Sequence, residues 1–128
     1  MDFPENLKYS DHDEWVRVEG DHIVVGISAF AQDALGELVH IEMLPEIGDT
    51  VEAGDAICEV ESVKAVAEIY SPVNGEIVAF NEALEDEEDI VNNDPYGEGW
   101  LIKIKVTDAS GLDSLLDVDA YKAKIEEA

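Results

Sequence analysis

Basic side chains are scarce in this sequence. The 128 residues include seven Lys and Arg against 32 Asp and Glu, which gives a formal net charge of −25 at pH 7. A surface with such an excess of carboxylates repels nucleic acid and anionic membranes, so we expect neither as a partner. The hydrophobic fraction of 46% is ordinary for a globular protein. The length fits a single domain spanning residues 1–128.

The charge imbalance also predicts sensitivity to salt. Repulsion among like charges destabilises a compact state. Concentrated salt screens that repulsion, because the Debye length falls to about 3 Å at 1 M. We therefore hypothesise that the chain comes from a halophilic organism with a very salty cytosol. An acidic docking surface for basic partners is the alternative, and the two interpretations are compatible.

Cysteine and long apolar runs are scarce as well. Cys58 is the only cysteine, so no internal disulfide can form, which is typical of a reducing cytosol. In a strand-rich stretch we expect Cys58 to be a small buried side chain. The N-terminal residues lack the basic and apolar regions of a signal peptide, and no apolar stretch approaches the about 18 residues of a membrane span. These features predict a cytoplasmic protein.

Hydrophobic alternation and glycine-containing turns predict a mainly β protein. Gly-Asp and Asn-Gly pairs mark turns between several of the candidate strands. Strict alternation places Leu38 and Ile41 on opposite faces of one strand, and Ile57 and Cys58 on opposite faces of another. Many short strands with such turns indicate a sandwich or a barrel. The candidate strands cover residues 15–18, 22–27, 38–43, 56–61 and 100–106.

Two helices are also predicted. Ser28 is a candidate N-cap for a short helix over residues 29–35, because its side chain can accept from free backbone N–H groups. Near the C-terminus, Ser110 and Asp117 are candidate N-caps, and an amphipathic helix is predicted over residues 118–127. We expect this C-terminal helical segment, which begins at about residue 110, to cover the sheet.

Lys64 is the only basic residue between Arg17 and Lys103, in a tract that contains 21 Asp and Glu residues. Its compact ammonium group is carried on a flexible four-carbon stem that modifying enzymes can reach. An ordinary solvated lysine is the alternative interpretation.

Lys64 also lies between two similar segments. Residues 36–41 (GELVHI) match residues 75–80 (GEIVAF), and residues 51–57 resemble residues 84–90. Two similar halves packed face to face would present their connection as an exposed turn. Residues 62–65, however, contain neither Gly nor Asn, which tight hairpins usually require. Residues 56–70 are therefore compatible with one long strand or with two.

Motifs along nearly the whole chain match one known family. The most specific are Glu-Ser-Val-Lys-Ala at residues 61–65 and Asp-Pro-Tyr-Gly-Glu-Gly-Trp at residues 94–100, with further matches at residues 12–16, 25–28, 31–33, 35–37, 71–76 and 81–84. On these residues the chain resembles the H protein of the glycine cleavage system. The resemblance implies a barrel-sandwich hybrid of the lipoyl-domain type. Its core would span about residues 22–106, followed by a C-terminal helix.

The resemblance also implies a site. The family carries lipoic acid in amide linkage on a lysine at a hairpin tip, and Lys64 matches that lysine. Glu61, Ser62, Val63 and Ala65 would be the flanking recognition residues. A lipoate ligase or a lipoyl/octanoyl transferase would attach the group.

By the same resemblance the chain is a carrier and not an enzyme. It would take the aminomethyl group of glycine from a pyridoxal-phosphate glycine decarboxylase (P protein) to a tetrahydrofolate-dependent aminomethyltransferase (T protein). A flavin-containing dihydrolipoamide dehydrogenase (L protein) would then reoxidise its lipoyl group. No nucleic acid and no membrane takes part in this scheme.

Glu14 and Glu68 match acids that face the cleft into which the family's loaded arm folds. Carboxylates there would attract the cationic amine of the arm, more strongly where solvent is reduced. In a chain with 32 acidic residues, solvated surface charges are the alternative. Ala34 stands where some members have a histidine that contacts the arm, so that contact is absent here.

No other motif carries recognisable chemistry. His12, His22 and His40 lack metal-ligand spacing, and one cysteine does not make a zinc site. The acidic run over residues 85–89 lacks the order of an EF-hand and is expected to be a solvated face. Three alternatives to a glycine-cleavage carrier remain open: a lipoyl or biotinyl domain of another complex, a lipoyl donor to other complexes, and an unmodified acidic interaction module.

Overall fold

The computed structural model describes residues 4–10, 12–85, 87 and 89–127. Within these residues the strands form two sheets, which confirms the predicted mainly β fold. A six-stranded sheet has the order β1-β2-β3-β9-β8-β5, and a three-stranded sheet has the order β4-β6-β7. The strands are β1 (Lys8–Tyr9), β2 (Glu14–Glu19), β3 (His22–Ile27), β4 (Leu38–Met43), β5 (Thr50–Val51), β6 (Ala56–Ser62), β7 (Val66–Tyr70), β8 (Asn74–Phe80) and β9 (Ile102–Asp108).

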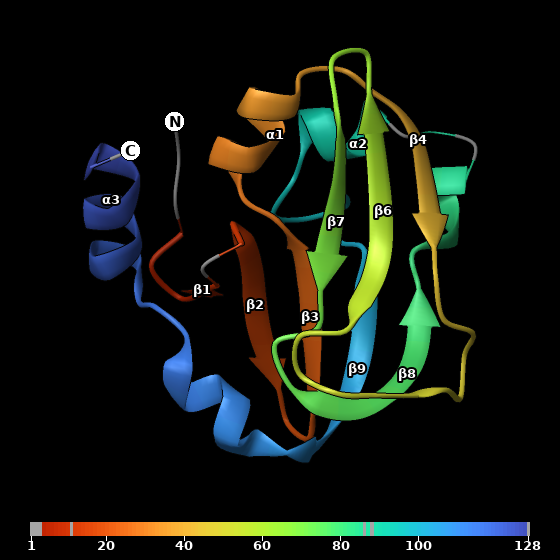
Figure 1. Ribbon diagram of the computed structural model, residues 1–128, viewed down its shortest axis with the longest axis vertical. Coiled ribbons are helices and arrows are strands. Elements are labelled where there is room, and N and C mark those ends of the chain that lie inside the picture. Colours follow the sequence, from red (N-terminus) through yellow and green to blue (C-terminus); the bar gives the residue numbers. More distant parts are fainter. Residues whose placement is uncertain (1–3, 11, 86, 88, 128) are drawn as a thin grey trace.

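Short helices lie around the sheets (Figure 1). The Ser28 Oγ accepts from the Ala31 N–H at 3.2 Å, and the Asp117 Oδ1 accepts from the Ala120 N–H at 2.8 Å, which confirms these two predicted N-caps. None of the helices in the described part of the chain has the length and apolar character needed to cross a membrane. The helical segments are α1 (Ala29–Leu35), η1 (Glu82–Glu85), α2 (Asp89–Asn93), η2 (Ala109–Ser114) and α3 (Val118–Glu127).

Two β-bulges make the side-chain directions on β4 and β6 differ from the strict alternation predicted from the sequence. The register of β4 against β6 shifts just after Leu38, so Leu38 and Ile41 both contribute to the core while Val39 is 46% exposed. A second shift on β6 places Ile57 and Cys58 together in the core. The predictions that these pairs lie on opposite faces are therefore wrong. An extra residue in one strand of a pair resets the two-residue period of side-chain direction.

The sequence repeat is only partly structural. Residues 36–41 and 75–80 each contribute to a strand, β4 and β8. Residues 51–57, in contrast, run from the end of β5 through a turn into the start of β6. Residues 84–90 run from the end of η1 to the start of α2, with residues 86 and 88 outside the described part. The acidic run over residues 85–89 is therefore described only in part, and Glu87 and Asp89 within it are exposed.

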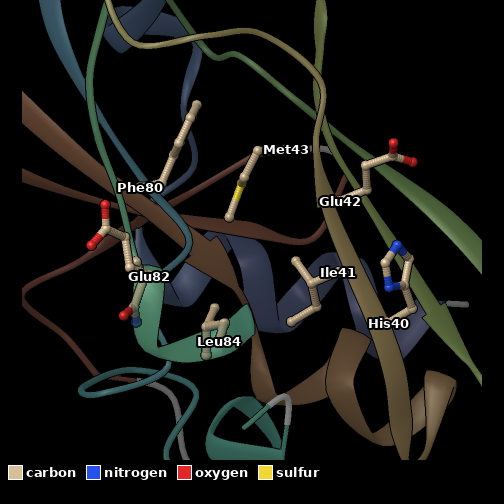
Figure 2. Close-up of a pocket in the computed structure, with 8 residues that line it drawn as sticks. His40, Ile41, Glu42, Met43, Phe80, Glu82 and Leu84 are labelled. Carbon is tan, nitrogen blue, oxygen red and sulfur yellow. The ribbon is translucent and has the colours of Figure 1, made fainter. Parts of the chain in front are cut away.

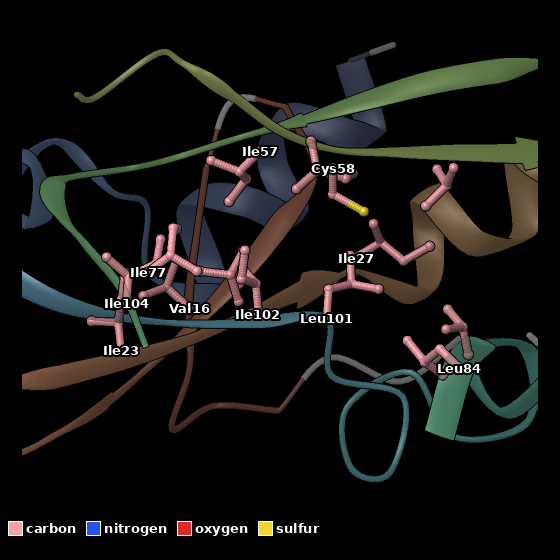
Figure 3. Close-up of a cluster of buried hydrophobic side chains, with 14 of the residues drawn as sticks. Val16, Ile23, Ile27, Ile57, Cys58, Ile77, Leu84, Leu101, Ile102 and Ile104 are labelled. Atoms are coloured by element: carbon pink, nitrogen blue, oxygen red, sulfur yellow. The ribbon is translucent and has the colours of Figure 1, made fainter. Parts of the chain in front are cut away.

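The main core lies between the two sheets. Figure 3 shows Ile57 and Cys58 on β6 facing Val16, Ile27 and Ile102 of the larger sheet, and all five are buried. Burial of apolar surface is the dominant favourable term in folding. The packed sheets thus form a rigid support for the β6–β7 hairpin.

A second cluster attaches the C-terminal helix to the opposite side of the larger sheet. The Tyr121 ring on α3 stacks on Tyr9 with a centroid separation of 4.6 Å. Its hydroxyl oxygen lies 2.6 Å from the Ser28 Oγ and donates to the Asp13 Oδ1 at 2.9 Å. The helix therefore covers the sheet, as predicted, and is fixed by stacking and by polar contacts. This cluster consists of Leu7, Tyr9, Trp15, Val24, Val118 and Tyr121.

Gly26 has a packing role in that cluster. It is the cross-strand partner of Trp15. A Cβ on Gly26 would lie 2.5 Å from the indole ring, so the absence of a side chain lets the tryptophan lie flat on β3. The indole N–H donates to the Pro95 carbonyl at 2.7 Å.

Candidate functional site

Lys64 lies in the turn between β6 and β7, the hairpin at the top of Figure 1. The two strands pair as far as Glu61 and Val66. The Ser62 Oγ accepts from the N–H groups of Lys64 at 3.1 Å and Ala65 at 3.0 Å. The Ser62 N–H donates to the Ala65 carbonyl at 2.8 Å. A serine hydroxyl therefore organises a turn in which Gly or Asn is the commoner choice.

The backbone of this turn is not left-handed. Among the described residues, Asp13 is the only non-glycine residue with a positive φ. Val63 and Lys64 therefore do not adopt the mirror-image turn that favours Asn-Gly. The missing Asn-Gly signal did not exclude a hairpin, and Ser62 was the signal that could have located it.

The tip exposes small and apolar groups around the amine. Val63 is 65% exposed and Val66 is 57% exposed, unusual values for β-branched side chains. Lys64, Ala65 and Glu61 are also exposed, whereas Ser62 is buried beneath them. Among the described residues, the Lys64 ammonium forms no ion pair. The primary amine is thus accessible to an acylating enzyme, with little bulk around it.

The tip is held against the corner between α1 and β4. The Val63 N–H donates to the Glu37 carbonyl at 3.1 Å. The Lys64 stem passes over Gly36, where an added Cβ would lie 2.9 Å from Cε. Sequence patterns could not reveal that this corner contacts the hairpin, because residues 36 and 64 are far apart in the chain.

Glu14 is buried at the first residue of β2, with 1% of its surface exposed. Its Oε2 accepts from the Tyr70 N–H at 2.7 Å, and its Oε1 accepts from the Ser10 hydroxyl at 2.8 Å. Burial raises the pKa of the Glu14 carboxyl above its ordinary value of 4.5, and these hydrogen bonds oppose the shift. Glu14 also lines a hollow of about 190 Å³ together with His12. It therefore connects β2 to β7 and still borders a cavity.

Glu68 occupies a different environment. It is exposed on β7 and lies directly across from Glu59 of β6, which in turn lies across from Glu42 of β4. Three carboxylates thus form a row across the smaller sheet. Like charges in register repel one another. The structure does not bring Glu68 into contact with Glu14, although Glu14 binds the backbone two residues further along β7.

A second hollow, of about 470 Å³, lies at the β4 edge of the smaller sheet. Figure 2 shows Ile41 and Met43 extending from β4 toward Phe80 and Leu84. Since the sheet order is β4-β6-β7, this hollow lies at the edge opposite the β7 backbone that Glu14 binds.

The remaining candidates are structural. Burial raises the pKa of the Cys58 thiol to about 12, with a smaller contribution from Glu59, so it is not a nucleophile at neutral pH. His12 packs against the Tyr70 ring at 4.6 Å. Within the described residues, no group of His, Cys, Asp or Glu has the arrangement of a metal site.

The two packed β-sheets, with an exposed lysine on a tight hairpin, form a fold of the lipoyl-domain class. The family model for "Glycine cleavage H-protein" matches residues 7–128. The chain therefore belongs to the glycine cleavage H-protein family.

Relatives and a solved structure agree with that assignment. A glycine cleavage system H protein of Idiomarina loihiensis is 55% identical over 125 residues, covering 97% of this chain and 96% of that protein. One from Bacteroides thetaiotaomicron is 50% identical over 125 residues, covering 98% of each. The crystal structure of a glycine cleavage system H protein from Mycobacterium marinum aligns with a TM-score of 0.88 at 35% identity, covering 97% of this chain and 99% of that one.

Members of this family are non-catalytic carriers that hold lipoate covalently on a lysine. The chain is accordingly a lipoyl carrier of the glycine cleavage system and works with the other proteins of that system. The predictions of fold, carrier function and cofactor are confirmed.

Proposed function

We propose that Lys64 carries the lipoyl group and that the β6–β7 hairpin presents it in turn to three enzymes. The observation that carries this proposal is the position of Lys64. It is the single basic side chain of a long acidic tract, and it lies exposed at the tip of a rigid hairpin. When bound, the lipoyl ring supplies a reducible disulfide at the end of a long flexible arm.

The residues around Lys64 fit this role. Attachment as an amide removes the lysine charge, so the loaded tip is apolar at Val63 and Val66, which are already exposed. Ser62 fixes the backbone on both sides of the lysine. The small Ala65 leaves the amine uncrowded, and Glu61 provides a negative charge at the end of β6. We propose that a lipoate ligase or a lipoyl/octanoyl transferase recognises these flanking residues.

We also propose the partners in finer detail. The loaded carrier docks with the glycine decarboxylase, the aminomethyltransferase and the dihydrolipoamide dehydrogenase in sequence. Tethering keeps the arm at high effective concentration near whichever partner is docked. A cytoplasmic location is part of the proposal, because a reducing compartment suits a chain whose one cysteine is a buried free thiol.

Glu14 and Glu68 are proposed as acids that attract the amine of the loaded arm. The proposal is better supported for Glu14 than for Glu68, because Glu14 borders a hollow and is largely shielded from water. Glu14→Gln and Glu68→Gln would be compared for the rate at which the aminomethyl group is lost without enzyme. Glu76→Gln is the control, since Glu76 is exposed on the larger sheet opposite Lys105. Faster loss in Glu14→Gln or Glu68→Gln than in the control supports the proposal, and equal rates in all variants contradict it.

The attachment site is tested by the intact mass and peptide map of protein purified from its host. We expect a mass increase of one lipoyl group, located on the peptide that contains Lys64. Complete absence of the modification would support an unmodified interaction module instead. With the lipoyl group in place, glycine-dependent release of carbon dioxide in the presence of the three partners separates a glycine-cleavage carrier from a lipoyl donor to other complexes.

A further inference from the structure

The corner formed by Gly36, Glu37 and Leu38 is held by one side chain of α2. The Asn92 Nδ2 donates to the Gly36 carbonyl at 2.8 Å, and the Asn92 Oδ1 accepts from the Leu38 N–H at 3.2 Å. Both bonds flank Glu37, whose carbonyl accepts from the Val63 N–H. A chain of hydrogen bonds therefore runs from α2 through this corner to the backbone residue that precedes Lys64.

The Lys64 side chain lies on the same corner. An ideal Cβ on Gly36 would be 2.9 Å from the Lys64 Cε and 3.6 Å from its Nζ, and the first distance is too short for two carbon atoms. Gly36 caps α1 with φ of 80° and ψ of −146°, a region of backbone space that is essentially restricted to glycine. A side chain at residue 36 would therefore displace the far end of the flexible lysine stem from the position that it occupies over the glycine.

We propose that Gly36 and Asn92 are positioning residues for the acylation of Lys64. In this view the corner holds the tip backbone at Val63 and directs the lysine stem over Gly36, which fixes the direction in which the amine is presented to the modifying enzyme. The inference rests on the proposed function, because it requires Lys64 to be the attachment residue.

The reaction shows why direction matters. In a lipoate ligase, a carboxylate oxygen of lipoate attacks the α-phosphorus of ATP, the bond to the β-phosphate breaks, and pyrophosphate leaves, which gives the acyl adenylate. The unprotonated Nζ then attacks the acyl carbon, an N–C bond forms, and the C–O bond to AMP breaks with its electron pair leaving on AMP. The amine proton passes to solvent. Misplacement of a reacting atom by about 1 Å can slow such a step by about a hundredfold.

A purely conformational role for Gly36 is the alternative, since its positive φ alone favours glycine. Gly54 separates the two explanations. It also has a positive φ, of 94°, but a Cβ there would meet nothing within 4 Å. Gly36→Ala introduces backbone strain and displaces the Lys64 stem, whereas Gly54→Ala introduces strain alone.

The experiment measures the steady-state kinetics of lipoylation by a purified lipoate ligase, with the whole unmodified chain as substrate. We expect Gly36→Ala to lower kcat by about tenfold relative to Gly54→Ala, with KM changed less than about twofold, because the tip surface that the ligase binds is retained. Acylation of Lys64 by a small succinimidyl ester, followed by peptide mass, should be unchanged or faster in Gly36→Ala. Equal kcat in the two glycine variants would overturn the role of Gly36.

Asn92→Ala provides a second test if Gly36→Ala does not fold. Its matched control is Asn81→Ala, because Asn81 also bridges two backbone groups, the carbonyls of Glu98 and Trp100, and contacts neither the corner nor the tip. We expect Asn92→Ala to lower kcat about threefold or more and Asn81→Ala to leave it unchanged. Equal kcat values in this pair would overturn the role of Asn92.

The same assay distinguishes failure of this inference from failure of the proposed function. If the wild-type chain is not lipoylated, or is lipoylated on another residue, the proposed attachment site is wrong. If the wild-type chain is lipoylated on Lys64 while each variant matches its control, the attachment site stands and the positioning role is wrong.

Discussion

The Ser62 Oγ lies 3.1 Å from the backbone nitrogen of Lys64 and accepts its hydrogen bond. The same oxygen accepts from the Ala65 N–H. Ser62→Ala removes the one acceptor of both hydrogen bonds from a turn that has no glycine. We expect a loss of about 1 kcal/mol in the free energy of unfolding, together with slower enzymatic lipoylation. Urea denaturation and the lipoylation rate measure the two effects.

Ser71→Ala is the control for the Ser62 prediction. The buried Ser71 hydroxyl donates to the Val73 carbonyl at 2.6 Å, in a turn away from Lys64. We expect a similar loss of stability without a change in lipoylation. Should Ser71→Ala slow lipoylation as much as Ser62→Ala does, general destabilisation and not the geometry of the tip would be the cause.

Tyr121→Phe tests the attachment of the C-terminal helix. The variant keeps the ring stacked on Tyr9 and removes the hydroxyl that contacts Ser28 and Asp13. We expect a loss of about 1–3 kcal/mol, because polar groups that are partly or fully buried lose a partner. The comparison is Tyr9→Phe, which removes the hydroxyl that donates to the Pro4 carbonyl and should cost less, because that bond is partly buried whereas the Tyr121–Ser28 bond is fully buried. Equal stability of Tyr121→Phe and wild type in guanidinium unfolding would contradict the prediction.

The raised pKa of the Glu14 carboxyl should make the free energy of unfolding depend on pH. Burial raises the pKa of its carboxyl in the folded state above 4.5, so above that pH the folded chain retains a proton that the unfolded chain has released. Its contribution to stability is thus fully present below pH 4.5 and falls as the pH rises through the folded-state pKa.

Glu14→Gln removes this titration while retaining groups that can bond Tyr70 and Ser10. We expect the stability of Glu14→Gln relative to wild type to increase as the pH rises from 4.5 to 7, measured by urea unfolding at several pH values. Glu14→Ala removes the same titration and should show the same trend with pH, but it should be about 1–3 kcal/mol less stable than Glu14→Gln, because the Tyr70 N–H is left without that acceptor. A relative stability of Glu14→Gln that falls with pH would contradict the assigned direction of the pKa shift.

The carboxylate row on the smaller sheet predicts a local salt effect. Glu59 lies between Glu42 and Glu68 in register. Glu59→Gln should therefore stabilise the chain by roughly 0.5–1 kcal/mol in dilute buffer, and the gain should vanish near 1 M salt. Glu76→Gln is the matched control, since Glu76 lies across from Lys105 and its loss should not stabilise the chain. Identical effects of the two variants at low salt would show that the register of charges does not matter.

The whole chain should respond to salt in the same direction. With a net charge of −25, we expect its free energy of unfolding to rise when NaCl is increased from about 0.05 M to 1 M. Full stability in dilute buffer would count against the hypothesis of a halophilic origin.

Much of the fold could be predicted from local patterns. The Ser28 and Asp117 caps, the alternation of β9 and the burial of Cys58 were all correct, because each depends on residues close together in the sequence. The two bulges could not be predicted, since a bulge depends on how two strands pair and not on either strand alone.

The candidate site also contains some features that the local sequence could predict and others that it could not. Lys64 and its flanking residues were predicted from a motif, and their role as the attachment site stays a prediction; the structure places Lys64, exposed, in the β6–β7 turn. The corner at Gly36 and its support by Asn92 were missed, because hydrogen bonds between residues 36 and 92 have no periodicity that a sequence reveals. Glu14 was selected by resemblance, but its burial and its bond to Tyr70 required the three-dimensional structure.

The most direct test of the account is Lys64→Arg in a glycine cleavage system reconstituted with the three partner enzymes and a lipoate ligase. Arginine keeps the charge and most of the length of the side chain but provides no amine for an amide bond. We predict no lipoylation and no glycine-dependent release of carbon dioxide, while Lys103→Arg behaves like wild type. Sustained glycine breakdown with Lys64→Arg would contradict the account.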